Sequence, residues 1–365
     1  MPKVPLRLIA ERVGCTRSTV SYALRDHPTI SVSLREKIKE VARDLGWVPD
    51  AELQRQMALV RTTNTRKDLP NIAIVINRAR VEFERLPTLG RHLEGAVRRA
   101  HELGFGTDLF SLSDEPLTEK RLEEIMHARG IKGVVLVDVD VTQDEKLLRV
   151  AEEFATVTVG VIPAKRVVHT VTADYMALGR RMMIELQKLG YRRPGVIIPR
   201  GVESLVQWSF TGGLHAGLGL CSTLEFIPFF YTKKPTIYVS QTEVQALNAW
   251  IDKHRPDCLV TLDTITVSSV ARMRGGDMPR SLFSLDYHLD EGAVGGIDQN
   301  SLDTGVAGVD MVVSLLDRGQ LGLPHIPRAV SVRESWIAPV AELRYSEFCD
   351  IRFEEMQRNA AAKSK

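Results

Sequence analysis

The sequence predicts an all-α helix–turn–helix headpiece followed by a much larger α/β body of doubly wound parallel sheets. Apolar residues recur at helical spacing through the first 46 residues. From residue 71 onward, β-branched runs alternate with amphipathic helices, which is typical of parallel sheets covered by helices. About 270 residues of this pattern exceed one such sheet, so we expect two α/β lobes.

The stretch Leu6–Arg25 predicts two short helices joined by a tight turn. The apolar face of the first helix consists of Leu6, Ile9, Ala10 and Val13. Gly14 suits the positive φ that ends a helix, and Thr16 stands where an N-cap belongs. Val20 and Leu24 of the second helix face inward. Its outward face is cationic and hydrogen-bonding, and it consists of Arg17, Ser18, Ser21, Tyr22 and Arg25. The alternative is a surface helical hairpin with ordinary solvated charges.

A third helix is expected after Ser31 or Ser33, and Ser33 with Glu36 has the spacing of a capping box. Its apolar stripe is Leu34, Ile38, Val41 and Leu45, and Gly46 ends it. The first 49 residues resemble, without gaps, the lactose-repressor (LacI/GalR) family of bacterial transcription regulators. The residues that carry this resemblance are Leu6, Ala10, Gly14, Thr16, Thr19, Val20, Ser21, Ile30, Ser31, Arg35, Gly46, Trp47, Val48 and Pro49.

The resemblance implies a transcriptional regulator, most simply a repressor. As a homodimer it would place the helix 17–25 of each headpiece in the major groove of a pseudo-palindromic double-stranded DNA operator. We expect Arg17 to make a bidentate contact to guanine, with Ser18 and Tyr22 beside it. The residues expected to hold phosphates are Thr16, Ser21, Ser31 and Arg35. Arg25 completes the exposed DNA-binding face.

In this family, a hinge helix follows the headpiece, orders on DNA and inserts an apolar wedge into the minor groove. Residues 50–61 predict a short helix here, and residues 62–70 predict a polar linker. The family's usual Asn, Ala and Leu are replaced by Asp50, Leu53 and Gln56. We expect Leu53 or Met57 to be the wedge; the alternative is that both pack in the dimer or on the body.

Charge is distributed unevenly along the chain. Residues 1–67 hold 13 basic and 7 acidic residues, whereas the remainder holds 35 and 39. A basic head on a mildly acidic body suits a polyanionic partner at one end only. The sequence has no apolar signal-peptide core and no run of 18 apolar residues, so we expect a cytoplasmic protein without a membrane span. The four scattered cysteines have no metal-binding spacing, and reduced thiols are expected.

The resemblance also implies a two-lobed body like that of periplasmic sugar-binding proteins, with three crossovers between the lobes. The expected divisions are a headpiece at 1–49, a hinge and linker at 50–70, the effector-binding and dimerisation body at 71–340, and a tail at 341–365. Lobe one would comprise about 70–169 and 297–325. Lobe two would comprise about 170–296 and 326–340.

Within the body, apolar runs predict strands at 72–76, 134–137, 157–161, 195–198, 258–262 and 282–285. Amphipathic periodicity predicts helices at 90–103, 119–128, 177–189, 243–254 and 304–316.

Ligands of open α/β sheets bind outside the carboxyl ends of the strands, so the residues that follow each strand are candidates for a binding cleft. These residues are Asn77, Arg78, Asp138, Asp140, Arg200, Glu203, Asp263, Asp286 and Tyr287. Carboxylates and amides of this kind hold hydroxyl-rich ligands in fixed orientations. For any single aspartate, the alternative is a helix N-cap.

Comparison with the family supports Asp263 and Asp286 as effector-binding residues. Two further pairs match motifs of the family: Gln299 and Gly305 match its Gln…Gly pair, and Asp174 and Gly179 match its Asp…Gly pair at the entry to lobe two. The position of the family's effector-binding Arg falls near Ser209. This chain has no Arg there, and Trp208 and Phe210 flank the position instead. An aromatic surface is therefore expected in its place, so the family's sugar specificity is not carried over to this chain. The alternatives are a small-molecule effector, either a sugar or another, more apolar metabolite, and a vestigial pocket.

No Ser/His/Asp elbow, phosphate loop or HExxH motif is present, so we expect neither an enzyme nor a cofactor or metal. Paired carboxylates in a cleft also suit a glycosidase, but the headpiece argues against one. Two further alternatives are a solute-binding protein with an idle headpiece and a DNA-binding regulator without small-molecule input.

Overall fold

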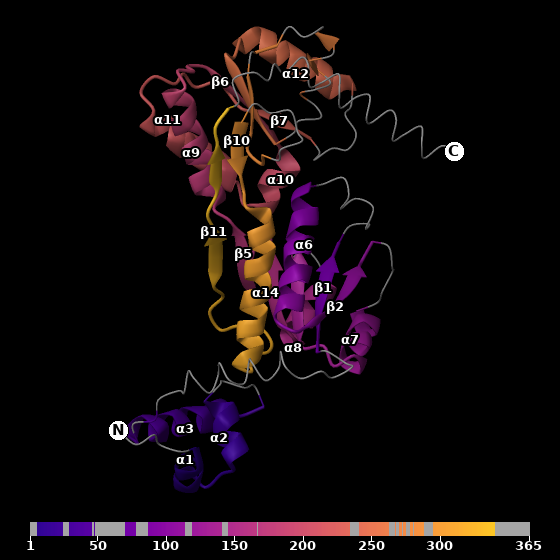
Figure 1. Ribbon diagram of the computed structural model, residues 1–365, viewed down its shortest axis with the longest axis vertical. Helices are drawn as coiled ribbons and strands as arrows, with labels where there is room; N and C mark the ends of the chain where they lie inside the picture. The colour runs from indigo at the N-terminus through magenta and orange to yellow at the C-terminus, as the bar shows by residue number, and fades with distance from the viewer. Residues whose placement is uncertain are drawn as a thin grey trace, which may run out of the picture.

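The computed structural model contains a helical headpiece and a body of two stacked α/β lobes (Figure 1). The residues that it describes are 6–24, 29–45, 47, 70–77, 87–113, 119–140, 145–165, 167–233, 241–262, 281–287 and 295–339, with a few residues between 267 and 279. The hinge helix and the C-terminal tail expected from the sequence lie outside these residues.

Three helices form the headpiece: α1 (Leu6–Val13), α2 (Arg17–Ala23) and α3 (Val32–Asp44). They enclose a small core in which Ile9, Val20 and Ile38 are fully buried. The Thr16 hydroxyl caps α2 as expected, since it accepts the Thr19 N–H at 3.1 Å. Ser31 caps α3 by accepting the Leu34 N–H at 3.4 Å, so the first of the two expected starts, after Ser31, is confirmed and the start after Ser33 is not.

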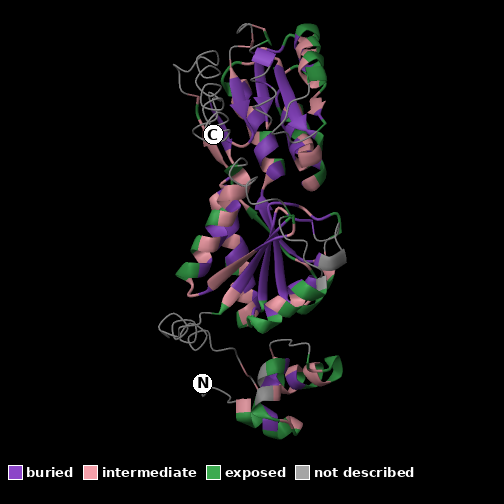
Figure 2. Ribbon diagram, turned by 90° about the vertical axis from the view of Figure 1, so that its right-hand side faces the viewer, coloured by how far each residue is buried: buried purple, intermediate pink, exposed green. Residues whose placement is uncertain are grey.

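Lobe one is a six-stranded sheet in the order β11-β5-β4-β3-β1-β2, in which every pair is parallel. Its strands are β1 (Asn71–Ile76), β2 (Gly106–Ser111), β3 (Gly133–Val137), β4 (Ala155–Val159), β5 (His169–Ala173) and β11 (Ala329–Val332). One face packs on α6 (Pro87–Glu102) and α14 (Ser301–Asp317). The other face packs on α7 (Glu119–Ala128) and α8 (Glu145–Glu153). Figure 2 shows the sheet buried between these layers.

Lobe two repeats this arrangement in the order β12-β10-β9-β8-β6-β7. Its strands are β6 (Pro194–Pro199), β7 (Phe230–Thr232), β8 (Cys258–Thr261), β9 (Leu282–Ser284), β10 (Gly295–Asp298) and β12 (Ser335–Ile337). Only β12 among these strands pairs antiparallel. One face packs on α9 (Tyr175–Lys188) and α11 (Ser209–Leu220), and the other on α12 (Gln241–His254). The short helix α10 (Arg200–Leu205) directly follows β6.

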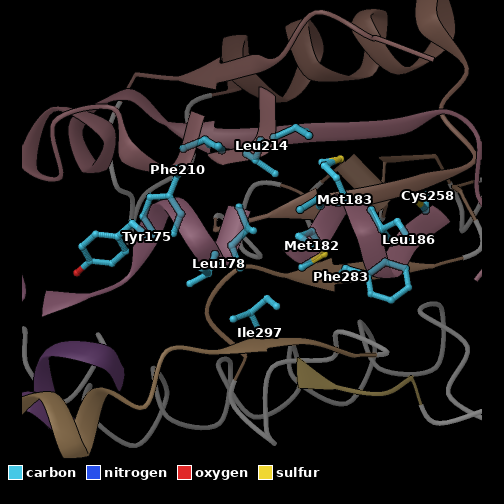
Figure 3. Close-up of a cluster of buried hydrophobic side chains, with 14 of the residues drawn as sticks. Tyr175, Leu178, Met182, Met183, Leu186, Phe210, Leu214, Cys258, Phe283 and Ile297 are labelled. Atoms are coloured by element: carbon cyan, nitrogen blue, oxygen red, sulfur yellow. The ribbon is translucent and has the colours of Figure 1, made fainter. Parts of the chain in front are cut away.

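Figure 3 shows the core under α9 and α11, where Met182, Met183 and Leu186 lie between the helices and the sheet. In each lobe the helix pair is in close contact at glycines. A Cβ at Gly305 of α14 would overlap the carbonyl oxygen of His92 in α6, and one at Gly213 of α11 would overlap that of Met176 in α9. Larger residues at these positions would force the helices apart.

The chain crosses between the lobes three times, as expected. The first crossover follows β5 at Asp174, whose side chain caps α9 by accepting the Ala177 N–H at 3.0 Å. The second follows β10 at residues 299–300, and the third lies between β11 and β12. The Asn300 side-chain amide joins the last two, because it donates to the Arg333 carbonyl at 2.6 Å and to the Ser335 hydroxyl at 3.2 Å.

These crossovers correct the expected lobe boundaries. Strand β5 extends to Ala173 and β11 lies beside it, so 170–173 and 329–332 belong to lobe one. Strand β10 keeps 297–298 in lobe two. Polar residues alternate through β5 (HTVTA), and β11 (AVSV) is only four residues long with a serine inside it, so neither has the continuous apolar run that marked the predicted strands.

The strands expected at 72–76, 134–137, 195–198, 258–262 and 282–285 are confirmed as β1, β3, β6, β8 and β9, and that at 157–161 is β4, two residues earlier. The five helices expected in the body are confirmed as α6, α7, α9, α12 and α14. Within the described residues, no helix is both long and apolar enough to cross a lipid bilayer.

Candidate DNA-binding surface and interlobe cleft

The second headpiece helix presents a polar, exposed face. Arg17 is exposed at its first position, and the Tyr22 side chain is 47% exposed one turn later. Thr16 and Ser31 use their hydroxyl oxygens to cap α2 and α3, so their backbones are fixed beside this face. Arg35 lies half-buried on the first turn of α3. The first turn of α2 contains no acidic residue.

For the other residues expected at this surface, the structure describes either the backbone alone or nothing. Ser18 and Ser21 lie on α2, but the directions of their side chains are not described. Arg25, Leu53 and Met57 lie outside the described residues. Their DNA contacts remain predictions.

On the lobe-one side of the contact between the lobes, Asp138 directly follows β3. Asp138 has a positive φ of 54°, and its Oδ2 lies 3.0 Å from Nδ1 of His92 on α6. Both side chains are largely buried. Gly160 lies against this pair, and a Cβ there would crowd both side chains. The aspartate therefore has a fixed partner inside lobe one, which the sequence did not reveal.

Tyr175 connects the two lobes. Its hydroxyl donates to the Gly160 carbonyl at 2.7 Å, although Tyr175 itself begins α9 of lobe two. Burial, followed by the negative charges of Asp138 and Asp286, raises the pKa of Tyr175 well above its usual value. The phenol therefore remains a neutral donor close to both carboxylates.

Two further hydrogen bonds cross between the lobes. The Thr88 hydroxyl at the start of α6 donates to Oδ2 of Asp286, which follows β9. The Ile162 N–H, in the loop after β4, donates to the Leu205 carbonyl of α10 at 2.9 Å. These contacts place Asp286 and α10 at the interface where the carboxyl ends of the strands meet.

On the lobe-two side, a cationic and aromatic group follows β6. The Arg200 guanidinium lies over the rings of Tyr231 and Trp208, with its central carbon 5.3 and 5.8 Å from their centroids. Trp208 is 42% exposed. Phe210 is only 1% exposed and packs on Tyr175 in the core, so the expectation that it belongs to an exposed aromatic surface is wrong.

Sequence reasoning missed Tyr231, because β7 is only three residues long and has no strand pattern of its own. It placed Arg200 at a strand end but gave it no role.

The remaining effector-binding candidates are dispersed. Asn77 is exposed at the end of β1. Gln299 is buried, and its side-chain amide donates to the Leu285 carbonyl at 2.9 Å, so it holds the second crossover against β9. Asp263 lies outside the described residues. Among the residues that the structure describes, no three His, Cys, Asp or Glu side chains are grouped as a metal site.

Comparison with known proteins identifies the headpiece. Residues 6–50 match the family model described as "Bacterial regulatory proteins, lacI family". The chain is 23% identical over 134 residues to the "HTH-type transcriptional regulator MalR" of Staphylococcus xylosus. That match spans 37% of each of the two chains.

Solved structures share the fold of the whole chain. A "transcriptional regulator CelR-cellobiose complex" has a TM-score of 0.57 at 19% identity, covering 93% of this chain and 99% of that one. A lac repressor dimer bound to operator and the anti-inducer ONPF has a TM-score of 0.56 at 15% identity, covering 93% and 98%. At these identities the likeness establishes the headpiece-plus-two-lobes architecture.

Proposed function

We propose that this chain belongs to the lacI family of bacterial regulatory proteins and is a sequence-specific DNA-binding repressor that acts in the cytoplasm. The observation that carries the proposal is the exposed face of α2, with Arg17 and Tyr22 outward on a helix fixed by the Thr16 cap. A helix of this kind fits the major groove.

A homodimer would place two such helices on a two-fold axis, so the operator is a pseudo-palindrome. A small-molecule effector in the interlobe cleft would shift the lobes and change operator affinity. The hydrogen bonds from Thr88 to Asp286 and from Ile162 to Leu205 support this coupling, because they depend on how the lobes are positioned. Allosteric coupling of this kind is typically about 1–3 kcal/mol.

The direct experiment is selection of duplexes from random DNA by the purified full-length protein at moderate salt. We expect enrichment of one pseudo-palindromic sequence, and binding that weakens steeply with salt because phosphates are neutralised. Failure to prefer any duplex over scrambled competitor would contradict the proposal.

Arg17→Ala should weaken binding to the selected operator by about 1–3 kcal/mol and relax base preference at one base pair in each half-site. Affinity for a set of single-base operator variants measures both effects. Arg43→Ala is the matched control, because Arg43 is exposed on α3 and carries the same charge away from α2. It should leave base preference unchanged. Equal weakening on all sequences by Arg17→Ala would make Arg17 a phosphate contact instead.

A further inference from the structure

We propose that the effector is a ring compound bearing a carboxylate, and that the Arg200 guanidinium binds that carboxylate. This inference rests on the proposed effector role of the cleft, and it names the chemical class of the ligand. The site consists of Arg200, Trp208 and Tyr231, which we call the cationic–aromatic platform. It lies at the carboxyl end of β6 and β7, beside the α10 segment that contacts lobe one.

The Arg200 guanidinium is held by two aromatic rings rather than by an acid. Its central carbon lies 5.3 Å from the Tyr231 centroid and 5.8 Å from that of Trp208. Stacking of this kind fixes the plane of a guanidinium and leaves its N–H groups available. No acidic side chain within the described part of the chain forms an ion pair with Arg200.

A carboxylate that could neutralise Arg200 is present but points elsewhere. Glu203 follows three residues later on α10, a spacing that normally allows an ion pair. Its side chain is 0% exposed, and Oε1 instead accepts the backbone N–H and hydroxyl of Thr211 at 2.8 and 2.7 Å. Burial raises the pKa of Glu203. The acid therefore caps the start of α11, and the charge of Arg200 stays available for a ligand.

The two rings are positioned by the same local network. The Tyr231 hydroxyl lies 3.0 Å from the Thr211 hydroxyl, so its ring is tied to Glu203 through Thr211. Trp208 packs edge-on to Tyr231 with centroids 5.7 Å apart. Its backbone N–H donates to the Glu203 carbonyl at 2.8 Å. Each platform residue is thus fixed before any ligand arrives.

The turn that carries Trp208 is strained. Gln207 and Trp208 have φ values of 52° and 59°, a region that bulky residues rarely adopt. Backbone strain of this kind clusters at ligand sites. Here the strained backbone holds a large aromatic ring 42% exposed beside a guanidinium that no carboxylate of the described residues neutralises. An exposed ring face of this kind suits the apolar face of a flat or sugar ring.

Together these features define the ligand. A planar guanidinium with free donors binds a carboxylate through two parallel hydrogen bonds. The adjacent indole face favours a ring near the carboxylate. Uronic acids and aromatic acids meet both conditions, whereas neutral sugars meet only the second.

Two matched pairs of probes test this inference: D-glucuronate against D-glucose, and benzoate against benzyl alcohol. Each pair differs only in whether a carbon bears a carboxylate or a hydroxymethyl group. Binding to the full-length protein is measured by calorimetric titration and by thermal shift. We expect at least one acid to bind saturably and at least about tenfold more tightly than its neutral partner, since charged bidentate hydrogen bonds are strong. Glucose 6-phosphate serves as a phosphate control and should bind more weakly than glucuronate.

Arg200→Gln should remove the preference for the acid, and Arg200→Lys should weaken it because the planar fork is lost. Arg180→Gln is the matched control, since Arg180 is exposed on α9 of the same lobe. It should bind the acid as the natural protein does. Trp208→Phe should abolish a ligand-induced change in tryptophan fluorescence if the indole contacts the ring.

The inference is overturned if neither acid binds more tightly than its neutral partner, if Arg200→Gln keeps the preference, or if the phosphate binds more tightly. Operator selection without ligand should be unaffected by all of these variants. A failure of the ligand inference is therefore distinguishable from a failure of the DNA-binding proposal.

Discussion

The two lobes have the same sheet order but present different chemistry to the cleft. β1 corresponds to β6, β3 to β8 and β4 to β9 in the two orders. After β3, Asp138 is already bonded to His92 and is largely buried. After β6, which corresponds to β1 rather than to β3, Arg200 is exposed, and among the described residues it is held by the aromatic rings of Tyr231 and Trp208. The same fold therefore presents a side chain with a buried partner in lobe one and an exposed cationic side chain in lobe two.

The first prediction tests whether close helix contact is equally essential in both lobes. Gly305→Ala and Gly213→Ala should each destabilise the protein by about 3 kcal/mol, because the added methyl overlaps a backbone carbonyl of the paired helix. Chemical denaturation followed by circular dichroism measures the free energy of unfolding. Gly219→Ala is the control: it lies on α11 with nothing within 4 Å, and it should be neutral or stabilising by up to about 1 kcal/mol. Tolerance of alanine at Gly305 would show that the helices of lobe one can separate at little cost.

The second prediction concerns the bond between the lobes. Asp286→Ala removes the acceptor for the Thr88 hydroxyl, which should cost about 1 kcal/mol of stability. It should also abolish the response of operator affinity to the ligand, while leaving affinity without ligand in place. Operator titration with and without the bound acid measures this. Thr88→Ser keeps the hydroxyl and should preserve the response. An unchanged response in Asp286→Ala would remove Asp286 from the site.

The third prediction, with the smallest expected effect, compares how a group in each lobe makes the stability of the protein depend on pH. Burial, then Arg328 and Arg318, lowers the pKa of His169 in lobe one. The unfolded chain therefore binds this proton more readily, and stability falls as pH drops below about 6.5. His169→Gln should reduce that loss. Burial raises the pKa of Glu203 in lobe two, so the folded state binds this proton more readily than the unfolded chain does. Stability therefore falls as the pH rises above the ordinary pKa of a glutamate.

Thermal unfolding between pH 4 and 8 would measure both effects. As the pH rises, the unfolding temperature of the natural protein should fall relative to that of Glu203→Gln. Over the same range it should rise relative to that of His169→Gln. Parallel curves for a variant and the natural protein would show that the group substituted does not govern this pH dependence.

The sequence was informative wherever one element alone carries the signal. Continuous apolar runs located β1, β3 and β6, and the carboxyl-end rule brought Asp138 and Asp286 to one interface. Strand β5 was missed because its sequence HTVTA alternates polar residues that are nonetheless buried. Helix α11 was missed because it is rich in glycine, which lowers helix propensity.

The site was less predictable than the fold. His92, Tyr175 and Tyr231 reach the cleft from a helix, a crossover and a three-residue strand, and their roles depend on tertiary contacts. Phe210 was misplaced because an aromatic residue at a helix start has no local feature that distinguishes core from surface. Its burial under Tyr175 follows from how α9 and α11 pack.

The amide of Asn300 has a mechanical consequence. Because it ties the second and third crossovers together, the lobes cannot bend at one connection without moving the other. A rotation of one lobe against the other would therefore be expected to have its axis near this residue. Helix α14 starts at that axis and extends 17 residues, roughly 25 Å, along lobe one. It therefore acts as a lever, which turns a small rotation beside the ligand into a larger displacement at the opposite end of lobe one.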